Sequence, residues 1–208
     1  MKQKLTILLA LTLPAATASA TLWELTWTGN VTTVDTELNT FFSVGDTVTG
    51  VLVYDDTTPD TDDSGNAGSY VGESFALIVN RQLGSDYVAT ADSGRAFINL
   101  SDNLASGDRL SAGGSVLIGD DVNGIPVNST GINLRDSTQA AIDSPALPTA
   151  LSLGDWDTSI FSVGFENGVE ADIRGDVTSL SLVQVPEPTS LALLGLGGLL
   201  VARRRRYS

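Results

Sequence analysis

Short segments in which apolar and polar residues alternate run along most of the chain. In the first, residues 22–27, Trp23, Leu25 and Trp27 fall on one face, as expected of a strand buried on one side. Many short strands separated by turn-forming residues predict an all-β domain, namely an antiparallel β-sandwich. Outside the chain ends, only residues 138–142 fit a helical turn. The other predicted strands are residues 47–54, 74–79, 87–90, 96–100, 109–118, 159–165 and 177–183, and the turn-rich stretches are 55–68, 101–108, 119–128 and 136–150.

A continuous apolar run replaces this alternation at each end of the chain. At the N-terminus, two lysines precede a mostly apolar run at residues 5–13, and small residues follow. This order is typical of a secretory signal peptide. Signal peptidase requires small side chains three residues and one residue before its cut, which Ala18 and Ala20 provide. We therefore expect residues 1–20 to be removed, because so short a run spans a bilayer poorly as an uncleaved anchor. Thr21 then begins the mature chain.

The C-terminal apolar run is followed by a cluster of arginines. Residues 190–202 would form about 20 Å of helix, against roughly 30 Å for the hydrocarbon core of a bilayer. The run has no polar face, which argues against a helix packed on the domain, and the basic side chains can extend its span by reaching the head groups. We expect a short transmembrane helix whose positive end stays cytoplasmic. The cluster consists of Arg203, Arg204, Arg205 and Arg206.

A proline-flanked glutamate stands just before that helix. Pro186, Glu187 and Pro188 favour extended backbone, the form that peptide-cleaving enzymes bind. The order of this motif, the short helix and the arginines over residues 185–206 resembles the PEP-CTERM sorting signal. An ordinary single-pass anchor is the alternative. Residues 42–55 also look like a region recurrent near the N-terminus of PEP-CTERM proteins.

The resemblance implies processing by exosortase, an integral membrane cysteine enzyme of Gram-negative bacteria that commonly make exopolysaccharide. Such a chain is exported, anchored transiently in the inner membrane, and then passed to the cell surface or extracellular matrix. The expected organisation is therefore a signal peptide (residues 1–20), an ectodomain (21–184) and a sorting signal (185–206). Signal peptidase and exosortase are the expected processing partners, and exopolysaccharide is a candidate partner outside the cell.

Composition narrows the chemistry of the ectodomain. The chain has no cysteine and no histidine, which excludes disulfides, a Ser-His-Asp hydrolase and an ordinary zinc site. Only five of its 11 basic residues, but 24 of its 25 acidic residues, lie in the ectodomain, whose formal charge is thus −19. Such a charge repels nucleic acid, so we expect no nucleic-acid partner.

Two local features suggest ligands. Asp55, Asp56, Asp60 and Asp62 crowd one loop, where carboxylate oxygens suit calcium, the one cofactor considered. The loop begins like an EF-hand but lacks its final glutamate, and a solvated acidic turn is the alternative. Trp156 lies between two aspartates and is the candidate for an exposed ring on which a sugar stacks.

We expect a non-catalytic surface or matrix protein with a structural or adhesive role. A carbohydrate- or calcium-binding module is the alternative. A glycan-processing enzyme is less favoured, because two carboxylates could serve as a glycosidase pair almost anywhere in so acidic a domain. Acidic pairs such as Asp155 with Asp157, or Asp172 with Asp176, therefore carry little information, and we expect no enzymatic activity.

Overall fold

The computed structural model describes residues 20–62, 64–168 and 170–186, and these ranges fold into an antiparallel, all-β domain. The all-β prediction is confirmed. The predicted signal peptide (except Ala20), transmembrane helix and arginine cluster lie outside the described residues. Within them, no helix has the length and apolar character needed to cross a membrane. The strands are β1 (Leu22–Val34), β2 (Thr47–Asp55), β3 (Ala67–Gly72), β4 (Ser74–Asn80), β5 (Tyr87–Ala91), β6 (Ala96–Ser101), β7 (Asp108–Ser115), β8 (Ile118–Gly119), β9 (Val127–Asp136), β10 (Thr158–Glu166) and β11 (Glu170–Gln184), with one 3-10 turn, η1 (Leu153–Asp155).

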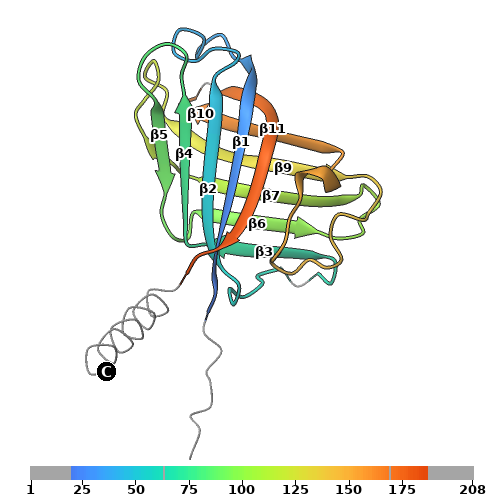
Figure 1. Cartoon of the computed structure of the whole chain (residues 1–208). Helices are drawn as coiled ribbons and strands as arrows, with labels where there is room; N and C mark the ends of the chain where they lie inside the picture. Colours follow the sequence, from blue (N-terminus) through green and yellow to red (C-terminus); the bar gives the residue numbers. More distant parts are fainter. Residues whose placement is uncertain (1–19, 63, 169, 187–208) are drawn as a thin grey trace, which may run out of the picture.

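Hydrogen bonds join all of these strands into one sheet, in the order β3-β6-β7-β9-β10-β11-β1-β2-β4-β5-β8. In Figure 1, β5, β4, β2 and β1 pass in front of β9, β7, β6 and β3 at a steep angle. The sheet therefore curls until its two halves face each other across the core. The finer prediction of a sandwich made of two separate sheets is not shown, because the ladder is continuous.

β11 carries the sheet around the bend. Its first half pairs with β10 and most of the strand pairs with β1, whose register against β11 shifts twice within residues 28–33. Such bulges bend a strand and increase its twist. The two layers pass very close here: a Cβ on Gly175 would lie 1.9 Å from the carbonyl oxygen of Asn30 and 2.6 Å from the ring of Phe161. Only glycine fits at this position.

The core lies between the two halves and is built from the alternating residues of each strand. Leu25 and Trp27 are buried as the pattern of β1 predicts. The indole of Trp27 stacks on Phe161, with ring centroids 5.5 Å apart, and so joins the two layers. Gly50 on β2 leaves the space that this indole occupies. Trp27 is therefore a core residue, as the one-sided pattern of residues 22–27 predicts.

Four differences from the predicted elements have local causes. β3 is missing from the predicted strands, since the turn-rich stretch at 55–68 includes its first two residues, and β9 is missing because Gly131 and polar residues dilute its apolar pattern. The predicted strand at 109–118 ends early, because Val116 adopts a positive φ of 50° that breaks the extended backbone. The helical turn expected at 138–142 is wrong. The carboxylate of Asp136 instead accepts hydrogen bonds from the backbone N–H groups of Thr138 and Ala140, which fixes a non-helical turn.

Buried carboxylates hold the loops in place. Asp46 is 1% exposed and accepts hydrogen bonds from the backbone N–H groups of Ser43 and Gln82, both at 2.9 Å. Asp108 and Asp136 are buried too and bind the backbone of neighbouring loops in the same way. Asp46 and Asp108 tie loops together at the ends of paired strands, and Asp136 fixes the turn that follows β9.

Candidate functional site

A polar hollow of about 360 Å³ lies where the end of β1 meets the β10–β11 hairpin. The strands place its side chains, since alternate residues of β10 and β11 face the same side of the sheet. Its charged lining consists of four carboxylates and one guanidinium, those of Asp35, Glu166, Glu170, Asp172 and Arg174. The surface that lines it is mostly polar.

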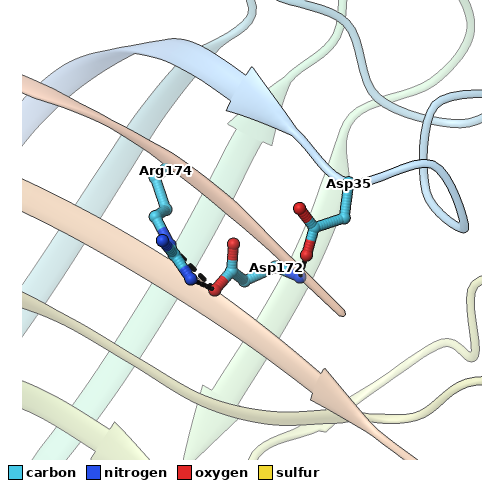
Figure 2. Close-up of polar contacts among 3 residues, drawn as sticks. All are labelled: Asp35, Asp172 and Arg174. Carbon is cyan, nitrogen blue, oxygen red and sulfur yellow. Dashed lines mark hydrogen bonds and ion pairs between the residues drawn. The ribbon is translucent and has the colours of Figure 1, made fainter. Parts of the chain in front are cut away.

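Backbone and side-chain bonds link three of these residues (Figure 2). The N–H of Asp35 donates to the carbonyl of Asp172 at 3.0 Å, and the N–H of Asp172 donates to the carboxylate of Asp35 at 2.9 Å. Arg174 donates through Nε, at 2.8 Å, and through Nη2 to one carboxylate oxygen of Asp172. The hydrogen bonds and charge of Asp172 raise the pKa of the Arg174 guanidinium. The other oxygen of Asp172 is buried and has no partner among the described residues.

Most of the charged side chains that line the hollow therefore serve to hold the surrounding strands and side chains together. Asp35 ties the end of β1 to β11, Asp172 holds Arg174, and Glu166 accepts a hydrogen bond from Asn128 at 2.6 Å. Sequence reasoning named Asp172 within an acidic pair but missed Asp35 and Arg174. The two-residue spacing of Asp172 and Arg174 on one strand was the available signal, because it places both side chains on one face.

The acidic loop uses its carboxylates locally. Asp60 accepts hydrogen bonds from the backbone N–H groups of Ser69 and Asp62, both at 2.9 Å, and these bonds lower the pKa of Asp60. Asp55 and Asp62 each bind the residue two positions later, and Asp56 binds the backbone near the start of β1. Among the described residues, no group of three or more acidic side chains is arranged to hold a metal. Calcium binding stays a prediction without support from this geometry.

The same loop covers an open edge of the sheet. β3 is the last strand on its side, and an unpaired edge strand invites pairing with another chain. Thr61 donates its N–H to the carbonyl of Ser69 at 2.9 Å, while the N–H of Ser69 is bound by Asp60. Both outward backbone groups of Ser69 are thus satisfied within the chain.

Trp156 does not offer an exposed ring. The side chain is 7% exposed and its indole nitrogen is buried, so the expectation of an accessible stacking platform is wrong. Trp156 directly follows the 3-10 turn η1 in extended backbone, and its side chain is buried while Asp155 and Asp157 on either side stay exposed. Asp157 stays at the surface and accepts a hydrogen bond from the backbone N–H of Ser137 at 2.7 Å.

The start of β1 and the end of β11 lie side by side at one end of the domain (Figure 1). Trp23 is paired with Gln184, and the N–H of Val185 still donates to the carbonyl of Leu22 at 2.8 Å. Pro186 follows at once and is exposed. The predicted sorting motif therefore begins directly after the last backbone bond of the sheet, and its remaining residues lie outside the described part.

Comparison with known proteins bears on that segment alone. No curated protein and no solved structure matches the chain. Residues 184–206 match the family model of the PEP-CTERM protein-sorting motif, in agreement with the resemblance noted from the sequence. The match begins at the last residue of β11. The chain therefore carries a PEP-CTERM protein-sorting motif immediately after its folded domain.

Proposed function

We propose that this protein is exported, processed at its C-terminal tail by exosortase, and delivered to the cell surface or extracellular matrix of a Gram-negative bacterium. The observation that carries this proposal is the PEP-CTERM match at residues 184–206. Its position supports the proposal, because a processing enzyme needs accessible extended backbone and the sheet ends at Val185. Signal peptidase removes residues 1–20, and the tail resides in the inner membrane only until it is cut.

The ectodomain in this proposal has a non-catalytic structural or adhesive role. Its loops are held by buried carboxylates such as Asp46, and the loop before β3 binds the outward backbone groups of Ser69 on that edge strand. These features suit long residence outside the cell, because a domain without cysteines cannot be stabilised there by disulfide bonds. The hollow near Asp35 supports the same proposal, because Asp35, Asp172 and Arg174 are engaged in bonds with one another.

Mass spectrometry of protein recovered from the cell surface tests the sorting proposal at both ends. The expected species begins at Thr21 and has lost the arginine cluster. Glu187→Ala, or removal of residues 203–206, should leave the C-terminally unprocessed chain in the inner membrane. Glu73→Ala, an exposed glutamate of the ectodomain, is the matched control and should sort normally. Surface protein that still ends in Tyr207 and Ser208 would contradict the proposal.

A second candidate, binding of neutral carbohydrate, is favoured by a groove on the outer face of β6, β7, β9 and β10. Its volume is about 220 Å³, and its lining includes Phe97, Ile160, Ser162, Asn133 and Gly131. An aromatic ring beside hydroxyl and amide groups, without a charged residue in the lining, suits the apolar and hydroxyl faces of an uncharged sugar.

Glycan arrays, probed with and without calcium, test this second candidate. Binding that Phe97→Ala abolishes would support it. Val88→Ala, which removes an exposed apolar side chain on β5, is the control and should leave binding intact. Flat arrays under both conditions would leave the structural role as the proposed function.

A further inference from the structure

The first residue expected in the mature chain is held by a single carboxylate. The backbone nitrogen of Thr21 donates to Oδ1 of Asp56 at 3.0 Å, and the N–H of Asp56 donates to the carbonyl of Thr21 at 3.1 Å. The other oxygen of Asp56 lies 3.5 Å from the indole nitrogen of Trp23. Asp56 thus binds the atom that signal-peptide removal would convert into an amine.

We propose that Asp56 is the binding site for the new N-terminal ammonium group, so that signal-peptide cleavage itself adds an ion pair to the fold. This inference rests on the proposed export and cleavage after Ala20. In that step, water hydrolyses the peptide bond between Ala20 and Thr21. The carbonyl carbon of Ala20 gains the hydroxyl oxygen, and the nitrogen of Thr21 is released as an amine that is protonated near neutral pH.

Cleavage changes what this nitrogen can do. As an amide it is neutral and donates one hydrogen bond, whereas an ammonium donates three and carries a positive charge. A charge-assisted hydrogen bond to a carboxylate is shorter and stronger than a neutral one. The surrounding loop contains Asp55, Asp60 and Asp62, so the new charge also reduces local repulsion.

The ion pair would act where the sorting tail leaves the domain. Leu22, the next residue along, is paired with Asp55 of β2 and accepts the last sheet hydrogen bond from Val185. Fixing Thr21 on Asp56 therefore holds the strand against which the end of β11 is paired. A processed N-terminus and an ordered start of the tail are then coupled through one strand.

The composition of the mature chain makes a selective experiment possible. Lys2 and Lys4 are the only lysines of the chain, and both lie in the predicted signal peptide. After cleavage the α-amino group is the only primary amine. Acetylation with an N-hydroxysuccinimide ester, followed by hydroxylamine to reverse esters on hydroxyl groups, therefore modifies that group alone.

The test compares the thermal midpoint of mature surface protein before and after acetylation. At low ionic strength we expect acetylation to lower the midpoint by about 2–4 °C, and 1 M NaCl to reduce the difference. In Asp56→Asn, acetylation should change nothing further. Asp62→Asn is the control, because it removes another exposed carboxylate of the same loop but should leave the effect of acetylation intact.

An unchanged midpoint after acetylation of the wild type would overturn the inference, and so would an equal decrease in Asp56→Asn. The mass of the starting protein separates this outcome from failure of the export proposal. If export cuts at another residue, the same measurement is made on a chain released with Thr21 as its first residue by a site-specific protease. The stability test then stands independently of the cellular processing route.

Discussion

Gly50 faces the indole of Trp27, and we predict that Gly50→Ala destabilises the ectodomain by about 1–3 kcal/mol. A Cβ at this position would lie 2.2 Å from Cε2 and 2.3 Å from Nε1 of Trp27. Carbon atoms in contact are separated by about 3.5–4.0 Å, so the ring or the strand must move by more than about 1 Å. The ring has no free space to enter, because it is 1% exposed and stacked on Phe161.

A smaller ring at Trp27 should relieve the clash. The clashing atoms belong to the fused part of the indole, which phenylalanine lacks. Trp27→Phe alone loses packing but also removes a buried N–H that has no partner among the described residues, an unmet bond that costs about 1–3 kcal/mol. These terms oppose each other, so we expect a net change within about 1 kcal/mol. The double variant should be more stable than the sum of the single changes predicts, by at least about 1 kcal/mol.

Urea unfolding of the mature protein, followed by far-ultraviolet circular dichroism, measures these differences. Gly65→Ala is the matched control, because a Cβ at that glycine meets no atom within 4 Å. The packing argument fails if Gly50→Ala is as stable as Gly65→Ala. Strict additivity of Gly50→Ala and Trp27→Phe would refute the assignment of the cost to the indole.

The remaining predictions concern buried acids and the bend of the sheet. Asp46→Ala should cost about 2–4 kcal/mol in urea unfolding because two backbone amides lose their acceptor, and Asp46→Asn, which keeps one oxygen, should cost about half as much. Hydrogen bonds lower the pKa values of Asp136 and Asp157 from 3.8. Their stabilisation is therefore complete above pH 3.8 and lost as the pH falls through the folded-state values. Urea midpoints measured from pH 7 down to about 2 should show this fall below about pH 4, with a shallower slope in Asp157→Asn. Gly175→Ala should reduce the yield of exported protein more than Gly50→Ala does, because the obstructing atom is a backbone carbonyl; equal yields would contradict this.

The sequence pattern predicts the strands in which apolar residues alternate with polar ones. It misses strands that form mainly because they pair with a neighbouring strand. β1 and β2 are predicted because their buried side chains recur at every second residue. β3, with two glycines in six residues, shows too little apolar alternation to be predicted, and its pairing with β6 makes it a strand. The continuous curl of the sheet depends on the bulges in β1 and the close approach at Gly175, which no single-strand pattern reveals.

The candidate sites show the same limit. Asp35 and Asp172 lie 137 positions apart in sequence, and only the pairing of β1 with β11 brings them together. The crowded aspartates of the acidic loop suit calcium and an edge-covering loop equally well by composition. The structure distinguishes the two, because the carboxylate of Asp60 accepts a hydrogen bond from the backbone N–H of Ser69. Only the fold shows that Ser69 lies within reach of Asp60. The sorting motif, in contrast, is a linear signal and is recognised from its residues alone.

The neighbouring ends of β1 and β11 also set how the domain faces its surroundings. At about 3.3 Å per residue, the 13 residues of β1 carry the chain roughly 40 Å from Leu22 to Val34, beside Asp35. The Asp35 hollow therefore lies at the end of β1 opposite the point from which the tail leaves the domain. A force applied through the tail would act first on the hydrogen bonds between the end of β11 and the start of β1, so these pairs would break one after another from that end.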